Sequence, residues 1–171
     1  MKKKIKTTVW LFINTAILLS ISVMTMGQND GTKSFMANEK WASDAIFDVP
    51  ESVCYSPGQQ VLYVANIAGK PTEKDGKGFI SKLSLTGEII NKAWYAGLDA
   101  PKGMGIYDNK LYVTNIDEVV AIDLTSAKDV GRWKCEGVKF ANDIAITANG
   151  DVHISGMQNR AIFSISNGKL S

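Results

Sequence analysis

The stretch KGMGIYDNKLYVTN (residues 102–115) places two short apolar runs on either side of a turn-forming Asp-Asn pair. The same pattern of strand, turn and strand returns in ESVCYSPGQQVLYVAN (51–66) and in NDIAITANGDVHISG (142–156). The segments LYVAN and LYVTN are nearly identical, and VHISG occupies the equivalent position in the last stretch. The sequence therefore contains an internal repeat that is built from short strands.

Further apolar runs complete each repeat. GFISKLSL, EVVAIDL and AIFSISN follow as third strands, and EIINKAWYAG and DVGRWKCEG follow as fourth strands in the first two repeats. Units of roughly 40 to 50 residues with four short strands are typical of a β-propeller. No segment beyond the N-terminal region shows helical periodicity. We therefore predict an all-β propeller; the alternative is a β-sandwich, which needs no internal repeat.

The repeats span about residues 50–100, 101–140 and 141–171, and the last one stops after its third strand. Three four-stranded blades, the last one incomplete, cannot close a ring of about four to eight blades. The sequence thus predicts the N-terminal part of a six-bladed ring; the alternative is a half-ring that is completed by association. Residues 40–49 have strand character and are expected to supply the outer strand of the last blade.

The N-terminal region has the features of a signal peptide. MKKKIK is positively charged, VWLFINTAILLSISV is apolar, and Thr25 and Gly27 are small residues before a predicted cleavage point. We predict a signal peptide over 1–27, a lead-in over 28–45 and a partial propeller over 46–171. The protein would be exported and periplasmic or extracellular; the alternative is an uncleaved segment that anchors it to the membrane.

The charge balance argues against one class of partner. The chain has 19 Lys and Arg against 17 Asp and Glu, a formal net charge of +2, and four of the lysines lie in MKKKIK. The remainder is near neutral and lacks the basic patch that nucleic-acid binding requires. We expect a small-molecule substrate or ligand and no nucleic acid.

Two pairs of residues lie in strand-like segments. Cys54 and Cys135 could form a disulfide in an exported protein, or they could be small core residues, which is the favoured interpretation. Trp94 and Trp133 occupy like places in two fourth strands. We expect them to pack between repeats rather than to bind a ligand.

The repeat brings polar residues together that are distant in sequence. The first strand of a propeller blade lies nearest the central axis, and Glu51, Lys102 and Asn142 stand near the start of that strand in the three repeats. A carboxylate beside an amide carbonyl suits a hard cation such as calcium, which takes about six to eight oxygen ligands. The alternative is local: Asn142 and Asp143 cap a turn, and Glu51 is a solvated loop acid.

Two further features bear on a site. The connection IAGKPTEKDGKG (67–78) is long in the first repeat only, and we expect it on the side where the first strand starts, as a lid or as a plain surface insertion. His153 is the only histidine, and a structural partner is expected for it rather than a role as catalytic base. No GxSxG motif is present, so nothing supports a serine nucleophile of that type.

Several stretches resemble a known family. PESVCYSPGQQVLYVAN (50–66) resembles the opening blade of the six-bladed calcium propellers of the regucalcin/gluconolactonase group. FANDIAITANGDVHIS (140–155) resembles their Pro-Asn-Gly-Leu-Ala segment and, more closely, the Asn-Asp-Ile segment of paraoxonase-like propellers. DAPKGMGIYDNKLYVTN (99–115) is similar to strictosidine-synthase-like and NHL-type repeats. The resemblance covers about residues 46–171.

The resemblance implies a metal site. In the family, a Glu of the first blade and an Asn of the third blade bind the catalytic divalent metal, and these map onto Glu51 and Asn142. Asp143 matches a paraoxonase-like Asp that helps to hold a second, structural calcium. Glu51 is followed by Ser-Val instead of Gly-Pro, which is a departure from the family pattern.

The resemblance also implies a substrate pocket. The matching second-blade region places Lys102, Gly103 and Met104 there, although Lys102 stands about where the family has an Asn. The expected function is an exported metal-dependent hydrolase of the lactonase type, with calcium at the axis as Lewis acid. The alternative is a non-catalytic propeller that binds a ligand or a protein on its top face.

Overall fold

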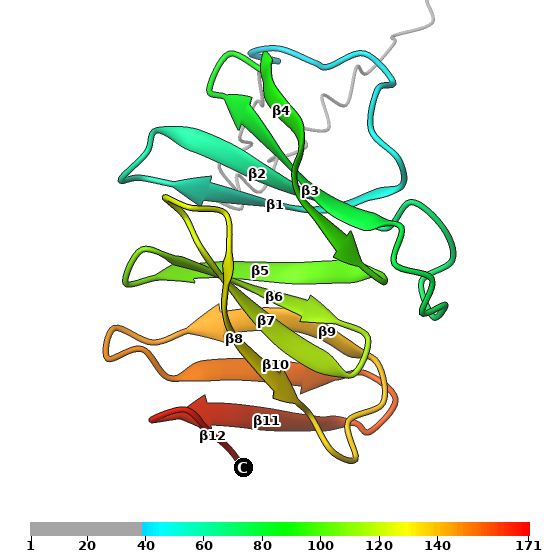
Figure 1. Ribbon diagram of the computed structural model, residues 1–171, viewed down its shortest axis with the longest axis vertical. Helices are drawn as coiled ribbons and strands as arrows, with labels where there is room; N and C mark the ends of the chain where they lie inside the picture. Colours follow the sequence, from blue (N-terminus) through cyan, green and yellow to red (C-terminus); the bar gives the residue numbers. More distant parts are fainter. Residues whose placement is uncertain (1–38) are drawn as a thin grey trace, which may run out of the picture. The chain divides into compact units, whose positions relative to one another are not determined.

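Three antiparallel sheets of four strands each make up the regular structure of residues 39–171, the part of the chain that this computed structural model describes (Figure 1). Blade one contains β1 (Pro50–Ser56), β2 (Val61–Asn66), β3 (Gly78–Ser84) and β4 (Ile89–Leu98). Blade two contains β5 (Pro101–Tyr107), β6 (Lys110–Asn115), β7 (Glu118–Asp123) and β8 (Asp129–Lys134). Blade three contains β9 (Ala141–Ile146), β10 (Val152–Gly156), β11 (Ala161–Ser166) and β12 (Lys169–Leu170). The predicted signal peptide (1–27) lies outside the described residues and stays a prediction.

Each blade is a meander in which strands pair in the order of the sequence. A hairpin with a two-residue loop connects β5 and β6, and the loop residues Asp108 and Asn109 have φ angles of 48° and 56°. Two central residues with positive φ fit the right-handed twist of paired strands, and Asp and Asn tolerate this conformation better than most residues. The turn-forming Asp-Asn pair therefore forms the hairpin that the sequence predicts.

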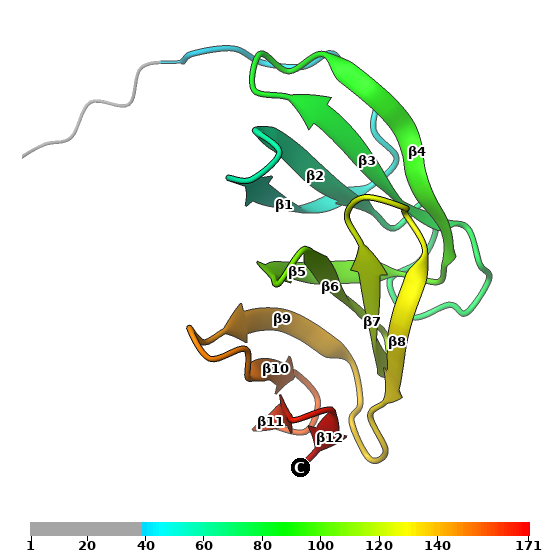
Figure 2. The ribbon, with the colours of Figure 1, turned by 60° about the vertical axis from the view of Figure 1, so that its left-hand side comes forward.

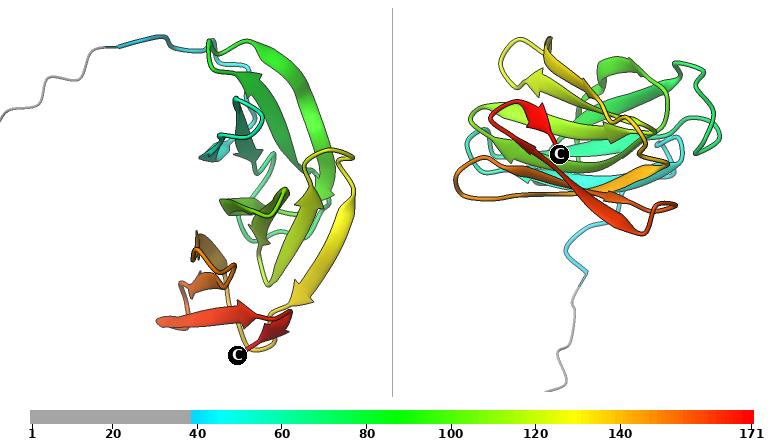
Figure 3. Two further views of the ribbon diagram at one scale, coloured as in Figure 1. Left: turned by 90° about the vertical axis from the view of Figure 1, so that its left-hand side faces the viewer. Right: turned by 90° about the horizontal axis from the view of Figure 1, so that it is seen from below.

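The blades follow one another along an arc. Figures 2 and 3 show β1, β5 and β9 on the concave side of this arc and β4 and β8 on its convex side. First strands of successive blades also contact one another. This is the blade arrangement of a β-propeller, so the predicted fold class is confirmed.

Two details differ from the expectations. Blade three has a fourth strand, because Lys169 and Leu170 pair with Ser166 and Ile165 of β11. Residues 40–49 form no strand within the described part of the chain.

The segment over 40–49 packs on a turn of blade one instead. The indole Nε1 of Trp41 donates a hydrogen bond to the carbonyl oxygen of Leu85 at 2.9 Å, and a Cβ placed on Gly87 would lie 2.7 Å from the Trp41 ring. A strand needs a free sheet edge to pair with, whereas Trp41 holds this segment against the connection between β3 and β4. The expected strand over 40–49 is therefore absent from the described residues, whereas its pairing with the last blade of a ring stays a prediction, because that blade is not among them.

The hydrophobic core lies between blades. Tyr63 and Ala65 alternate along β2 and face blade two, where they meet Leu111 and Val113 of β6; all four are fully buried. The ring of Trp94 lies 4.6 Å from that of Tyr63. Side chains of one strand thus fill the space between two sheets, which fits the period of two along a strand.

The second interface repeats the first. Trp133 stacks on Tyr112 at 6.1 Å, and its Nε1 donates a hydrogen bond to the carbonyl oxygen of Gly168 in blade three at 2.9 Å. Both tryptophans therefore pack between repeats, as predicted. Cys54 and Cys135 are free thiols that pack against the two core clusters, so the structure contains them as core residues rather than as a disulfide.

The outer face of blade three has no partner among the described residues. His153 and Ile162 stand where Tyr112 and Val119 stand in blade two, but Ile162 is 70% exposed, whereas Val119 is fully buried. We call this surface, which is lined by Asp143, Ala145, His153, Ser155 and Ile162, the open face. No helix long and apolar enough to cross a membrane occurs in residues 39–171.

Candidate functional site

A backbone irregularity marks the start of the first strand in all three blades. The strand register shifts between Pro50 and Ser52 in blade one, and between Pro101 and Met104 in blade two. In blade three it shifts opposite Ser155. A β-bulge changes the direction in which a side chain points. The residues at these three irregularities are those that the sequence singles out, namely Glu51, Lys102, Gly103, Asn142 and Asp143.

An asparagine side chain holds the backbone ahead of each irregularity. The Asn66 carboxamide oxygen accepts a hydrogen bond from the Asp48 amide at 3.2 Å, and that of Asn115 accepts one from the Asp99 amide at 2.9 Å. Asp48 and Asp99 each lie three residues before the first site position of their blade. The repeated Asn of LYVAN and LYVTN therefore positions the start of each first strand.

Blade three reaches the same result with a different residue. Gly156 stands at the end of β10 in place of the Asn, and Asn159 accepts the hydrogen bond from the Lys139 amide instead. Lys139 again lies three residues before the site position, Asn142. Asn159, three residues after Gly156, thus accepts the hydrogen bond that Asn66 and Asn115 accept in the other two blades.

Residues in the left-handed region precede two of the three site positions. Val49 has a φ angle of 54° and Phe140 has one of 63°, and each lies two residues before its site position, Glu51 or Asn142. The carbonyl oxygens of Val49 and Phe140 accept backbone hydrogen bonds at 3.1 and 3.0 Å from the residues that follow β2 and β10. A branched or aromatic residue is strained in this region and needs such support.

The three irregularities meet at one hollow of about 260 Å³ on the side where the first strands start. We call it the central hollow, and its lining consists of Glu51, Ser52, Gly103, Asn142 and Asp143. Three predicted metal ligands and one predicted substrate-pocket residue therefore come together from three blades. Sequence reasoning missed Ser52, although it directly follows Glu51.

Gly103 permits this close approach. A Cβ on Gly103 would lie 2.6 Å from the Asn142 carbonyl oxygen and 2.6 Å from the Cα of Asp143. The hydroxyl of Thr114, from the next strand of blade two, donates a hydrogen bond to the same Asn142 oxygen at 2.6 Å. Only a residue without a side chain allows the two backbones to pass at this distance.

The side-chain oxygens of the central hollow differ in the hydrogen bonds that they already accept. The Asn142 carboxamide makes no hydrogen bond with any other residue of the described part. Asp143 accepts one from the Ile144 amide at 2.9 Å, which is the local capping that the alternative interpretation expects. Its second carboxylate oxygen remains available in the described part of the chain.

Burial and charge act in opposite directions on Glu51. Desolvation raises the pKa of the Glu51 carboxyl above its usual value, the Lys102 charge opposes this rise, and the Asp143 charge adds to it. A cation next to Glu51 would stabilise its ionised form, which burial and the neighbouring carboxylate disfavour. The electrostatics of the hollow therefore favour a positively charged ligand.

Lys102 and Met104 lie behind the hollow and not in its lining. Lys102 is only 1% exposed, and its ammonium donates hydrogen bonds to the carbonyl oxygens of Pro71 at 3.0 Å and Ala100 at 2.8 Å. Met104 packs against the core between blades one and two. The expected position of Lys102 at the open channel mouth is thus not the one observed, because its ammonium points into the protein; whether either residue contacts a substrate stays a prediction.

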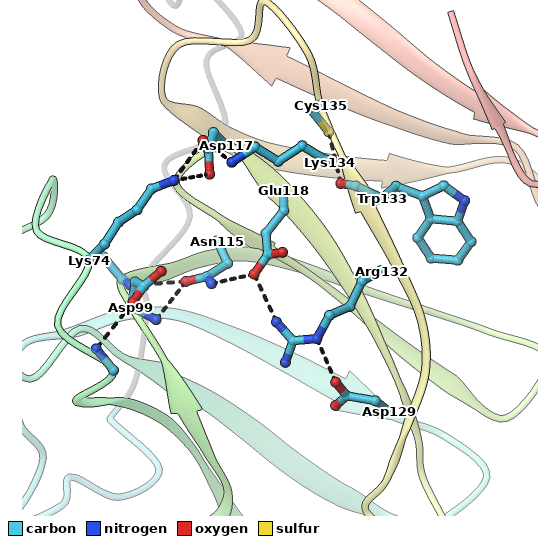
Figure 4. A network of polar contacts seen from close by, with 12 residues as sticks. Lys74, Asp99, Asn115, Asp117, Glu118, Asp129, Arg132, Trp133, Lys134 and Cys135 are labelled. Atoms are coloured by element: carbon cyan, nitrogen blue, oxygen red, sulfur yellow. Dashed lines mark hydrogen bonds and ion pairs between the residues drawn. The ribbon is translucent and has the colours of Figure 1, made fainter.

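The long connection between β2 and β3 lies across the boundary of blades one and two. It starts where the Ile67 amide donates to the Val49 carbonyl oxygen at 3.1 Å, on the predicted side. Figure 4 shows Lys74 of this connection bound to Asp117 of blade two, with its Nζ 2.7 Å from both carboxylate oxygens. The connection is therefore fastened to the neighbouring blade beside the central hollow.

His153 lies on the open face together with Asp143 and Ser155. The Ser155 hydroxyl accepts a hydrogen bond from the Asp143 amide at 3.0 Å, so this serine serves the backbone of β9. In blades one and two the equivalent positions are covered by the next blade. These three residues therefore form part of a sheet face rather than a second site.

Comparisons with known proteins support the fold alone. No family model matches the chain, and no curated protein matches it. A solved structure of a nidogen/laminin complex is similar, with a TM-score of 0.59 and 12% identity, over 75% of this chain and 48% of that one. A catalytically inactive virginiamycin B lyase from Staphylococcus aureus, solved with quinupristin, matches with a TM-score of 0.46 and 14% identity, over 71% of this chain and 54% of that one.

Both matched structures are β-propellers. The chain spans about half the length of each of them. At such low identity the likeness concerns the fold and not the reaction.

Proposed function

We propose that this chain belongs to an exported, metal-dependent hydrolase of the lactonase type, with a divalent cation, calcium, bound in the central hollow. The observation that carries the proposal is the meeting of Glu51, Asn142 and Asp143 from two blades in one polar hollow. The resemblance to regucalcin/gluconolactonase and paraoxonase-like propellers supplies the reaction class. The signal-like N-terminus supports export, to a periplasmic or extracellular location.

The donor set fits calcium in kind. It offers two carboxylates, one carboxamide oxygen and the Ser52 hydroxyl, all hard oxygen ligands of the type that calcium prefers. Within the described residues, no group of three or more His, Cys, Asp and Glu forms a metal cluster. Water would complete the coordination of a cation in the central hollow.

In this proposal the residues of the central hollow would bind the cation and orient the substrate beside it. When bound, the cation would supply Lewis acidity toward a lactone carbonyl. Glu51 of blade one and Asp143 of blade three provide negative charge, and Asn142 adds a neutral carboxamide oxygen. The hydroxyl of Thr114 fixes the backbone of Asn142. Gly103 lets the backbone of Asn142 and Asp143 pass close to β5 and so brings these oxygens toward Glu51, while a contact between Lys102 and the substrate remains part of the proposal.

The test is calcium binding and lactone hydrolysis by the purified protein and its Glu51→Gln variant. We expect calorimetry to detect calcium binding that Glu51→Gln weakens at least about tenfold, because the change removes one of only two carboxylates. Hydrolysis of a panel of lactones should disappear with chelator and return with calcium. The matched control is Glu88→Gln, since Glu88 is an exposed acid on the turn before β4.

Hydrolysis that survives both chelator and Glu51→Gln would refute the metal mechanism. Calcium binding without hydrolysis would favour the second candidate, a non-catalytic propeller that binds a ligand or a protein. The small number of protein ligands in the hollow favours this candidate, and so does the similarity to a propeller solved in a complex with laminin. Retention of a partner that depends on calcium and on Glu51 would then identify the function.

A further inference from the structure

Lys102 has an unusual environment for an ammonium group. Only 1% of the residue is exposed, and no carboxylate of the described residues lies within ion-pair distance of it. Two backbone carbonyl oxygens, of Pro71 and Ala100, accept its hydrogen bonds, and the face of the Phe140 ring lies 4.4 Å away. A buried charge is costly unless such dipoles replace its water, so the protein has built a complete binding site for this cation.

The contacts of this ammonium come from all three blades. Pro71 belongs to the connection between β2 and β3 of blade one, Ala100 precedes β5 of blade two, and Phe140 precedes β9 of blade three. The backbone of the same residue also serves the site, because the Lys102 carbonyl oxygen accepts a hydrogen bond from the Ser52 hydroxyl at 2.5 Å. One residue therefore touches every segment that carries a residue of the central hollow.

The contact with Phe140 has the most direct effect on the hollow. Phe140 is held in the left-handed region, with a φ angle of 63°, and it lies two residues before Asn142. The attraction between an ammonium and an aromatic ring is strengthened where the charge is desolvated, and it is then comparable to the cost of a strained backbone. The side chain of Lys102 can thus set the direction in which β9 starts.

We propose that Lys102 is a positioning residue, an internal cation that fastens the connection between β2 and β3 and the start of β9 to blade two, and so sets Asn142 opposite Glu51 in the central hollow. The part of this inference that concerns calcium affinity rests on the proposed function. The part that concerns amide exchange does not, because amide exchange measures the backbone of the protein without metal.

The first experiment measures amide hydrogen exchange in the metal-free protein and in Lys102→Met, which keeps an unbranched side chain one atom shorter and removes the charge. The reporters are the amides of Met157, bonded to the Phe140 carbonyl oxygen at 3.0 Å, and Gly76, bonded to Asp99 at 3.1 Å. We expect exchange at both to rise at least about tenfold, while the amide of Val113 in the core of blade two stays protected. Equal acceleration everywhere, or no change at the two reporters, would overturn the proposal.

The second experiment compares calcium affinities. Coulomb's law alone predicts tighter binding in Lys102→Met, because a positive charge near two carboxylates is gone. We expect weaker binding instead, by about tenfold, as is usual when a residue that orients metal ligands is lost. Ile122→Val, a small change in the buried core between blades one and two, is the control for a general loss of stability and should leave the affinity unchanged.

A rise in affinity in Lys102→Met would refute positioning. Should Lys102→Met fail to fold, Phe140→Leu removes only the ring below the ammonium and should accelerate the Met157 amide while leaving the Gly76 amide as it is. Equal rates at the Met157 amide in Phe140→Leu and the parent protein would count against the proposal. If the parent protein binds no calcium, the proposed function fails, and the exchange rates alone decide the role of Lys102.

Discussion

Gly103 shows how much a single residue contributes to the central hollow. An added methyl group would meet the backbone of Asn142 and Asp143 at 2.6 Å, and backbone atoms in a paired strand cannot rotate away as a flexible side chain can. Three of the residues that line the hollow thus depend on the absence of one Cβ. The sequence alone identified Gly103, but as a substrate contact rather than as the reason for the close approach of β5 and β9.

We predict that Gly103→Ala lowers the free energy of unfolding by about 1 to 3 kcal/mol, the usual cost of forcing extra volume into a packed interface, and weakens calcium binding. Thermal or urea unfolding measures the first effect and calorimetry the second. Gly58→Ala is the matched control, because nothing lies within 4 Å of a Cβ at Gly58. Equal stability of the two variants would show that the blades separate easily.

At the scale of the element, a buried asparagine determines where a first strand starts. The Asn115 carboxamide oxygen accepts hydrogen bonds from the amides of Asp99 and Ala100 at 2.9 and 3.0 Å, and its amide donates to Glu118 at 2.9 Å. Figure 4 shows this asparagine at the centre of a polar network that continues to Arg132 and Asp129. The repeat of LYVAN and LYVTN made the strand predictable, whereas this function of its last residue was visible only in the structure.

We predict that Asn115→Ala costs about 2 to 3 kcal/mol of stability, since two backbone amides lose their acceptor and one of them, that of Ala100, is fully buried. Chemical denaturation checks the value. Asn91→Ala, which removes an exposed and local hydrogen bond to the Ala93 amide, should cost far less. A similar loss in both variants would mean that water replaces the Asn115 side chain.

The connection between β2 and β3 should loosen in acid. Although burial alone would raise it, the pKa of Asp117 lies below its usual value, because hydrogen bonds and charges from Lys134 and Lys74 outweigh the desolvation. The stabilisation that Asp117 contributes is therefore fully present above about pH 4 and is lost as the pH falls through the lowered pKa of the folded state.

In the Asp117→Asn variant, we expect this acid-dependent part to be absent already at neutral pH. The loss of stability should be at most about 1 kcal/mol, as for other partly exposed ion pairs. Exchange at the Gly76 amide against pH is the measurement, with Asp108→Asn as the control for an exposed ion pair outside the connection. A pH profile that is the same with and without the Asp117 carboxylate would disprove this role.

At the scale of the molecule, the open face of blade three remains available to a partner. Ile162 is 70% exposed there, and Met157, which lines an adjoining hollow with Ile162, is 54% exposed. The equivalent surface of blade two is the one that blade three covers. An exposed apolar sheet face promotes association. Blade three therefore exposes the kind of sheet face that blades one and two bury against the next blade.

We predict that the chain of residues 28–171 associates in solution and that Ile162→Asp increases the monomeric fraction several-fold. Light scattering coupled to size exclusion measures it. Val130→Asp is the control, because Val130 is similarly apolar and 52% exposed but lies on β8, on the convex side of the arc. A stable monomer without the substitution, with a cooperative melt, would contradict the prediction.

The sequence by itself determined the blades and the gathering of the site. A period of two along short strands, turn residues between them and a near-identical segment in two repeats suffice to place Glu51 and Asn142 around one axis, because equivalent positions in a propeller lie together. Asp143 and Gly103 were added by the resemblance to known propellers. The tertiary structure alone decided which way Lys102 points, that Trp41 packs on a turn, and that Phe140 lies under an ammonium. These depend on contacts between segments distant in sequence, where the burial of one charge is balanced by groups from three different blades, and no local pattern of residues encodes such a balance.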